Sequence, residues 1–270
     1  MELSLFSIDL ARRRGMLEAK NLTKQFGGVK AVDDFSFKVK KGTVHAIIGP
    51  NGAGKTTLVN MLTGVYSCDS GSVWLDGADV TNTSTDQLVY RGVCRTFQHL
   101  EVCGNMTALE NVLLGFDRYM SKNILKVSFR TKQIKDDEER YTKRALHLLG
   151  LIGIEKHADT LAKNLSYGIL KKLEIIRALA TSPELILLDE PVAGLNPKET
   201  AEVADLIRKL TADDVTIILI EHDMRMVMDL SEYITVMNFG KKLAEGTPAE
   251  IKNNPDVIKA YLGGGSFENV

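Results

Sequence analysis

The 270-residue sequence predicts an α/β fold that is interrupted by a helical insertion. Two short, continuous apolar runs, at residues 185–188 and 216–220, are typical of strands buried on both faces of a parallel sheet. An amphipathic helix is expected between them, over residues 198–210. From about residue 98 to residue 180, strand signals fade and helical spacing dominates.

The composition is that of an ordinary globular protein and excludes two classes. Hydrophobic residues make up 44% of the chain, which is too much apolar material for a disordered protein. The 34 Lys and Arg residues nearly balance 35 Asp and Glu residues, so the chain lacks the positive field of a strongly basic nucleic-acid binder. No apolar run approaches the 18 or so residues that a membrane-spanning helix needs.

Cysteine usage and the N-terminus both favour the cytoplasm as the default compartment. Cys68, Cys94 and Cys103 form no C-x-x-C pair, so small hydrophobic thiols are expected instead of a zinc or disulfide framework. The triplet at residues 12–14 follows the short apolar stretch instead of preceding it, unlike a signal peptide.

Further elements follow from local patterns. Alternating residues predict a half-buried strand at 35–39, and an apolar run predicts a core strand at 44–48. Turn residues and helix-capping signals predict the rest: a helix over 56–62 ended by Gly64, a strand at 73–75 with a turn at 76–77, a hairpin around 238–240, and a last helix opened by the capping box 247–250.

A glycine-rich loop carries the clearest chemical signal. Residues 49–56, GPNGAGKT, match G-x-x-x-x-G-K-[ST] at every fixed position, with a buried strand before and a helix after. Small glycines let backbone N–H groups wrap around a polyphosphate, and the helix N-terminus adds positive potential. We expect Lys55 to reach the β- and γ-phosphates of a nucleotide and the Thr56 hydroxyl to bind Mg²⁺.

Two other strand ends supply acidic and basic groups. Asp189 and Glu190 follow the apolar run 185–188, and ligands bind open α/β sheets at the carboxyl ends of their strands. Asp189 suits Mg²⁺ coordination, directly or through water, and Glu190 suits a general base that polarises the attacking water. His222 follows the run 216–220, where it can sense a γ-phosphate and hold that water.

In this order the motifs resemble those of the ATP-binding subunits of ABC transporters, over roughly residues 16–263. Gln98, in Arg-Thr-Phe-Gln, resembles the Q-loop glutamine, which contacts Mg²⁺ or water and couples the site to a membrane partner. Residues 165–168, LSYG, resemble the signature motif, and residues 193–196 resemble the D-loop. The resemblance implies a nucleotide-binding set that comprises Phe26 (stacked on adenine), Gly49, Asn51, Gly52, Gly54, Lys55, Thr56, Thr57, Ser166 and Gly168.

The resemblance also implies the architecture. A P-loop NTPase core with a mixed sheet flanked by helices and an antiparallel β subdomain is expected at residues 16–97 and 180–248. An inserted α-helical subdomain is expected at 98–179, a C-terminal helix and tail at 249–270, and an N-terminal extension at 1–15.

Within the family, several segments resemble the ATPase subunits of branched-chain amino acid importers. These segments are GGVKAV at 27–32, RTFQH at 95–99, AGLNP at 193–197 and the tail at 254–263. Subunits for urea or amide import and for lipopolysaccharide export share much of this pattern. The resemblance implies ATP and Mg²⁺, a second identical or different ATPase subunit, two transmembrane permease subunits and a periplasmic or extracellular solute-binding protein. It places the chain on the cytoplasmic face of the inner membrane, and no nucleic-acid partner is expected.

The signature segment departs from the family's usual Leu-Ser-Gly-Gly-Gln. Tyr167 takes the first glycine position, which the importer group tolerates, and Ile169 takes the glutamine position. We expect weakened ATP turnover, because a polar contact near the ribose and phosphates is lost. A non-hydrolysing regulatory subunit is therefore one alternative. The other is a soluble ABC-type ATPase outside transport, although such proteins usually carry coiled-coil insertions, zinc modules or two cassettes.

One phosphate loop and one signature segment imply an incomplete site in a single copy. In this family, ATP is held between the phosphate loop of one subunit and the signature of another, so Ser166 of one copy is expected to face Lys55 and Thr56 of its partner.

Overall fold

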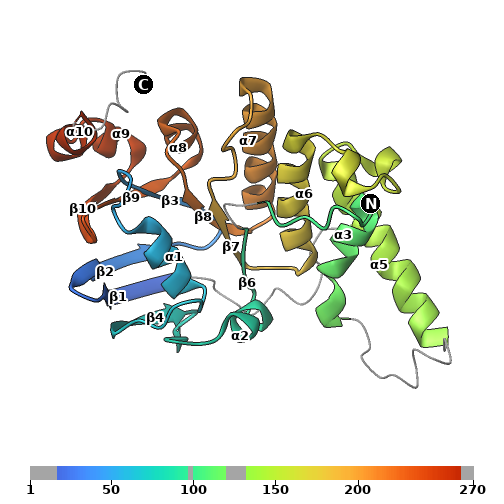
Figure 1. The fold of residues 1–270 in the computed structure, drawn as a ribbon, viewed down its shortest axis with the longest axis horizontal. Coiled ribbons are helices and arrows are strands. Elements are labelled where there is room, and N and C mark those ends of the chain that lie inside the picture. Colours follow the sequence, from blue (N-terminus) through green and yellow to red (C-terminus); the bar gives the residue numbers. More distant parts are fainter. Residues whose placement is uncertain (1–16, 97–99, 120–131, 263–270) are drawn as a thin grey trace. The chain divides into compact units, whose positions relative to one another are not determined.

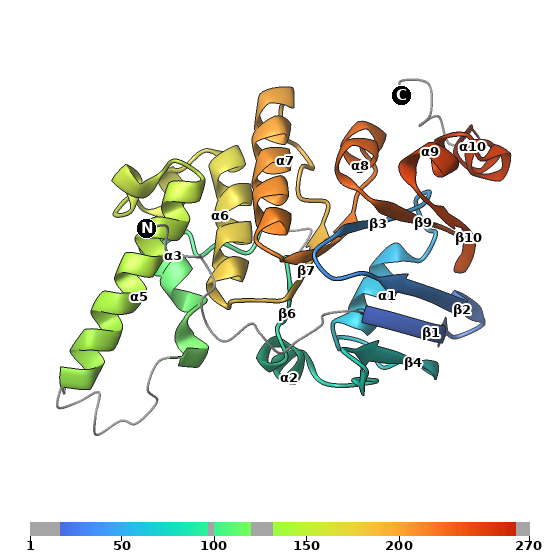
Figure 2. The same ribbon diagram turned by 180° about the vertical axis from the view of Figure 1, so that it is seen from behind.

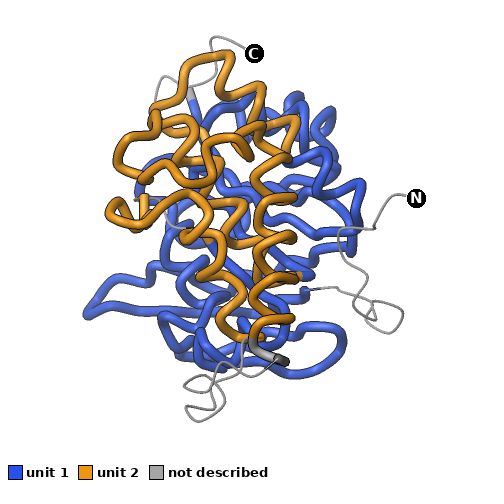
Figure 3. The backbone as a smooth tube through the Cα atoms, turned by 90° about the vertical axis from the view of Figure 1, so that its right-hand side faces the viewer, with its two compact units in different colours: residues 1–95, 184–191, 207–270 blue, residues 96–183, 192–206 orange. Residues whose placement is uncertain are grey.

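The computed structural model describes residues 17–96, 100–119 and 132–262, and these divide into two compact units. Unit 1 contains residues 1–95, 184–191 and 207–270, and unit 2 contains residues 96–183 and 192–206 (Figure 3). The domain boundaries predicted from the sequence, at 97/98 and 179/180, stay a prediction.

Unit 1 contains two sheets (Figure 1). The first is four-stranded and antiparallel, in the order β2-β1-β4-β5, and the second is six-stranded, in the order β10-β9-β3-β8-β7-β6. The strands of the first are β1 (Leu17–Phe26), β2 (Val29–Val39), β4 (Ser70–Leu75) and β5 (Ala78–Asp79). Those of the second are β3 (Val44–Ile48), β6 (Val93–Arg95), β7 (Leu185–Asp189), β8 (Thr216–Ile220), β9 (Tyr233–Asn238) and β10 (Lys241–Gly246).

The predicted parallel core is confirmed. Every residue of β3, β7 and β8 is buried, and these strands pair in parallel. The predicted hairpin joins β9 to β10 through Phe239 and Gly240, whose φ angles of 45° and 79° suit a tight two-residue turn.

The core of unit 1 is built around α1 (Lys55–Leu62). Leu58, Val59 and Leu62 of this helix are buried with apolar residues from both sheets, including Phe35 of β2 and Ile218 of β8. Figures 1 and 2 show α1 between the two sheets. The remaining helices of unit 1 are α2 (Thr85–Tyr90), α8 (Met224–Leu230), α9 (Pro248–Lys252) and α10 (Pro255–Leu262), and α9 begins at the predicted Thr247 capping box.

Unit 2 is helical in its described residues, as the sequence predicts. It contains α3 (Ala108–Leu114), α5 (Lys132–Leu151), α6 (Tyr167–Ala180) and the 3₁₀ turns Asp117–Tyr119, Glu155–His157 and Ala162–Asn164. Helix α7 (Pro197–Ala212) begins in unit 2 and ends in unit 1, and it matches the helix expected over 198–210. Among the helices of the described ranges, none is both long enough and apolar enough to cross a membrane.

A buried histidine in β3 should make the fold sensitive to acid. His45 is 1% exposed, its Nε2 lies 2.8 Å from the Thr235 hydroxyl, and burial lowers its pKa from 6.5 to about 4. Between these two values the unfolded chain takes up a proton that the folded chain does not, so stability falls as the pH drops from 6.5 towards 4. The full effect is on the order of 3 kcal/mol. Urea unfolding at pH 7, 6 and 5 should show a smaller loss for His45→Leu than for the wild type, and parallel losses would contradict the prediction.

Candidate functional site

The register of the parallel strands brings three loops to one edge of the six-stranded sheet. Ile47 of β3 pairs with Ile220 of β8, and Asp189 of β7 pairs with the same Ile220. The strands therefore end at nearly the same level, and the Glu190 amide donates to the Ile220 carbonyl at 2.9 Å. The phosphate-loop motif, the acidic pair and the histidine segment all leave the sheet at this edge.

The glycines of the phosphate loop occupy positions that larger residues could not. Gly54 caps the N-terminus of α1 with a φ of 107°, and a Cβ there would overlap the Ala31 carbonyl oxygen. A Cβ on Gly49 would overlap the Met237 carbonyl oxygen. The loop is held further by the Gly240 amide, which donates to the Ala53 carbonyl at 2.8 Å. The turn of the β9–β10 hairpin thus holds the phosphate loop through a backbone hydrogen bond.

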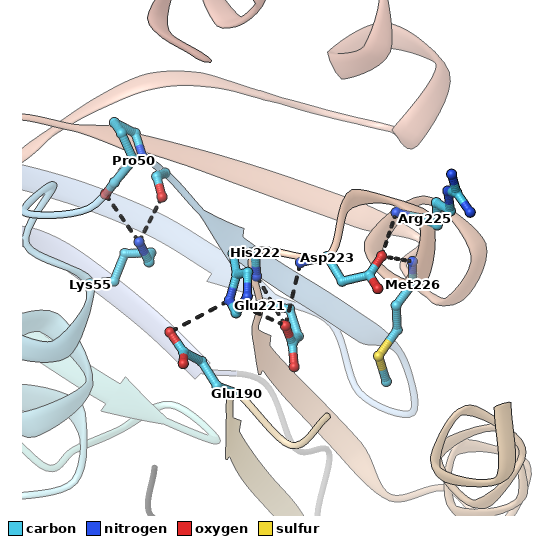
Figure 4. A network of polar contacts seen from close by, with 9 residues as sticks. Pro50, Lys55, Glu190, Glu221, His222, Asp223, Arg225 and Met226 are labelled. Carbon is cyan, nitrogen blue, oxygen red and sulfur yellow. Dashed lines mark hydrogen bonds and ion pairs between the residues drawn. The ribbon is translucent and has the colours of Figure 1, made fainter. Parts of the chain in front are cut away.

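Lys55 lies folded over this loop, as Figure 4 shows. Its Nζ donates to the carbonyl oxygens of Gly49 at 2.6 Å and Pro50 at 3.1 Å. Burial lowers the pKa of Lys55, and the negative charges of Glu190 and Asp189 oppose that shift. An ammonium group held at the mouth of a glycine loop and at the start of a helix fits a polyphosphate. Of the other predicted loop residues, Asn51, Gly52 and Thr56 are exposed and Thr57 is half-buried.

Glu190 and His222 lie close together beside the loop (Figure 4). Glu190 has a φ of 50°, which is uncommon for a residue other than glycine and often marks a functional position. The Nδ1 atom of His222 lies 3.7 Å from a Glu190 carboxylate oxygen and 3.8 Å from a Glu221 carboxylate oxygen. The His222 ring is exposed, so a carboxylate and an imidazole face the solvent together.

Glu221 and Asp223 hold the backbone around His222. The buried Glu221 carboxylate accepts the His222 amide at 3.0 Å. Asp223 caps α8 by accepting the amides of Arg225 at 2.9 Å and Met226 at 3.2 Å. The histidine is therefore presented by a short segment that is fixed on both sides.

Asp189 is buried at the end of β7 and is bound by Arg95. Phe26, the expected adenine platform, is 46% exposed at the end of β1. Tyr66 packs edge-on against its ring, with 5.5 Å between centroids, and the Lys24 amine lies 5.6 Å from its centroid. An exposed, supported aromatic face suits stacking on a base.

The signature residues lie in unit 2. Ser166 caps α6, because its hydroxyl accepts the Ile169 amide at 3.4 Å. Gly168 is buried, and a Cβ there would overlap the carboxylate of Glu199 at the start of α7. Glu199 in turn accepts the Asn196 amide at 3.1 Å, so the signature helix and the D-loop segment pack closely within this unit. Gln98 lies outside the described residues, so its predicted role stays a prediction.

The structure thus brings Lys55, Asp189, Glu190 and His222 together in unit 1. Three residues that shape this edge were not singled out from the sequence, namely Tyr66, Arg95 and Glu221. Arg95 stands three positions before Gln98 and Glu221 stands directly before His222, but a buried charged residue next to a motif carries no periodic signal that would mark it.

A glycine-rich loop between a buried strand and a helix, with carboxylates at the neighbouring strand end, defines a P-loop NTPase. The sequence model of the ABC transporter family matches residues 32–193, and the chain belongs to that family of transporter ATPases. A second model, described as branched-chain amino acid ATP-binding cassette transporter, matches residues 241–266. The predicted family and fold class are confirmed.

Curated relatives match almost from end to end. The chain is 44% identical over 251 residues to the high-affinity branched-chain amino acid transport ATP-binding protein BraF of Pseudomonas aeruginosa, covering 93% of this chain and 98% of that one. It is 42% identical over 249 residues to the corresponding protein LivG of Escherichia coli, covering 92% and 98%.

Solved structures show the same fold. The ADP conformation of an ATP-binding cassette of an ABC transporter superposes with a TM-score of 0.81 at 35% identity, covering 92% of this chain and 99% of that one. A dimeric cassette in a post-hydrolysis state, bound to ADP and Pi, gives a TM-score of 0.70 at 26% identity, covering 86% and 98%.

Proposed function

We propose that this chain hydrolyses Mg-ATP to power the import of branched-chain amino acids. The observation that carries the proposal is the identity of 42–44% to two such transport ATPases over more than nine-tenths of the chain. The match of the C-terminal residues 241–266 to a branched-chain-specific model supports the same substrate class.

Each of the residues at this edge of the sheet has its own proposed role in hydrolysis. Lys55 exchanges its two carbonyl contacts for phosphate oxygens, and the loop amides hold the rest of the polyphosphate. Thr56, Asp189 and Gln98 are the residues that would hold Mg²⁺, and the bound metal would neutralise phosphate charge. Glu190 takes a proton from water, and His222 keeps that carboxylate and the water in place.

Completion of the site requires a second ATPase subunit. Ser166 and Gly168 form a helix N-terminus in unit 2 of the chain. We propose that they bind the nucleotide held by the phosphate loop of a partner, and the dimeric relative with ADP and Pi supports such an assembly. Nucleotide binding then joins the subunits, and hydrolysis lets them separate, which moves two permease subunits between inward- and outward-facing states. A solute-binding protein on the far side would deliver the cargo.

We expect Ile169, at the start of the signature helix, to limit the rate of ATP hydrolysis. Its backbone amide is used by the Ser166 cap, while its apolar side chain is half-buried where the family has glutamine. Ile169→Gln should raise the ATPase rate several-fold by restoring a polar contact near the ribose and phosphates. The measurement is steady-state phosphate release with the partner subunits present, and an unchanged rate would mean that Ile169 does not limit turnover.

Uptake measurements test the transport function. A strain that lacks this chain should lose uptake of radiolabelled leucine, isoleucine and valine, while urea and acetamide uptake stay normal. The wild-type chain should restore uptake, and Glu190→Gln should not. The tagged chain purified from membranes should carry permease subunits with it. Normal leucine uptake together with lost urea or acetamide uptake would overturn the substrate assignment, and recovery from the soluble fraction alone would overturn the transport role.

A further inference from the structure

Arg95 connects two parts of the candidate site through one buried guanidinium. It is the last residue of β6, and its side chain is 8% exposed. Its Nη2 donates to a carboxylate oxygen of Asp189 at 2.7 Å, and its Nη1 donates to the Asn60 side-chain oxygen at 2.5 Å. Asn60 belongs to α1, the helix that follows the phosphate loop, and Asp189 ends β7.

Stability alone is a weak reason for this arrangement. Both charged groups lose most of their hydration, and a buried ion pair can often be replaced by apolar side chains without loss of stability. The planar guanidinium instead fixes geometry, because its donors point in set directions and hold one carboxylate oxygen and one amide oxygen at the same time. The Asp189 charge also acts on Lys55, so the carboxylate that Arg95 orients belongs to the phosphate-binding edge.

We propose that Arg95 is a positioning residue that fixes the orientation of the Asp189 carboxylate needed for turnover and reduces the negative charge that Mg²⁺ would meet there. The inference rests on the proposed Mg-ATP function. The same side chain also joins the end of β6 to α1 through Asn60.

The test separates geometry from charge by measuring turnover and metal dependence together. Arg95→Met should lower kcat roughly ten- to a hundredfold, as is typical when the partner of a metal-binding group is removed. It should also lower the Mg²⁺ concentration at half-saturation several-fold, because a positive charge beside the metal is gone. Arg95→Lys keeps the positive charge but loses the planar guanidinium that binds Asp189 and Asn60 together. This variant should therefore show the wild-type Mg²⁺ dependence, while its kcat stays reduced.

A binding readout makes the test independent of turnover. Binding of fluorescent mant-ATP to the purified full-length chain is measured in EDTA and during a Mg²⁺ titration. Arg95→Met should match the wild type in EDTA and respond to less Mg²⁺. The exposed Arg91→Met on the same unit is the matched control and should behave as wild type. Asn60→Leu leaves the ion pair intact and covers the case in which Arg95→Met does not fold; it should lower kcat without changing the Mg²⁺ dependence.

The possible results distinguish a failure of the inference about Arg95 from a failure of the proposed Mg-ATP function. If the wild type is Mg²⁺-dependent and Arg95→Met needs the same or a higher Mg²⁺ concentration, the inference about Arg95 is wrong and the proposed function stands. If Arg95→Met does not fold and Asn60→Leu keeps the wild-type kcat, the inference is likewise wrong. If the wild type neither binds nor hydrolyses Mg-ATP with its partners present, the proposed function is wrong and the inference falls with it.

Discussion

Glu190→Gln should reduce the ATPase rate by roughly a hundredfold or more while nucleotide binding survives. The carboxylate lies 3.7 Å from His222 and beside the phosphate loop, where it can accept a proton from water. Glutamine keeps the size and a hydrogen-bonding oxygen but cannot act as a base near neutral pH. The backbone of Glu190, which donates to Ile220, is unchanged by this substitution, so the fold should be retained.

The same variant should accumulate a closed dimer, because in the proposed cycle the subunits separate only after hydrolysis. Size-exclusion chromatography with saturating Mg-ATP and the natural partner subunit is the measurement, alongside phosphate release. Glu18→Gln on β1 is the matched control, since that carboxylate lies on the first sheet in a pair with Lys20 at 3.4 Å. Monomeric behaviour of Glu190→Gln under these conditions would contradict the two-subunit site.

The parts of the fold that the sequence predicted best are those with strong local patterns. The runs 185–188 and 216–220 are continuous and apolar because β7 and β8 are buried on both faces, and each is confirmed as a parallel strand. The hairpin at 238–240 and the Thr247 capping box are fixed by residues within four positions of one another. Interactions between residues close in the sequence are sufficient to predict such elements.

Elements with weak local patterns were missed. β1 was not predicted, because its exposed Lys20, Asn21 and Gln25 weaken the alternation of a strand that pairs with the neighbouring β2 and with β4. The three-residue β6 was missed because its strand character comes from pairing with β7, about ninety positions away in the chain. For the same reason the Arg95–Asp189 ion pair could not be predicted, although both residues stood inside recognised segments.

Lys55→Met should abolish tight nucleotide binding without weakening the fold. In the structure, Nζ satisfies its hydrogen bonds with the carbonyls of Gly49 and Pro50, and phosphate oxygens would replace these partners. Removal of a half-buried cation from a charged contact of this kind costs about 2–5 kcal/mol of binding free energy, which is a loss of thirtyfold or more.

Although Lys55→Met should lower the affinity for nucleotide, it should not lower the folding stability of the nucleotide-free chain. Burial is the largest influence on Lys55 and lowers its pKa, so the charged form is less favourable in the folded chain than in the unfolded chain. A lowered folded pKa therefore destabilises the folded chain at low pH, and this destabilisation disappears as the pH rises from the folded pKa to the unfolded pKa. Methionine removes the charge, so the urea midpoint at pH 7 should stay the same or rise.

The two measurements together identify the role of Lys55. Lys252→Met, on the exposed surface of α9, is the matched control and should change neither nucleotide binding nor the urea midpoint. A Lys55→Met chain that loses stability and affinity in parallel would show that the lysine is mainly a structural support of the loop. A stable chain that no longer binds mant-ATP would show that the folded protein tolerates a half-buried ammonium at this position because the nucleotide phosphates require it.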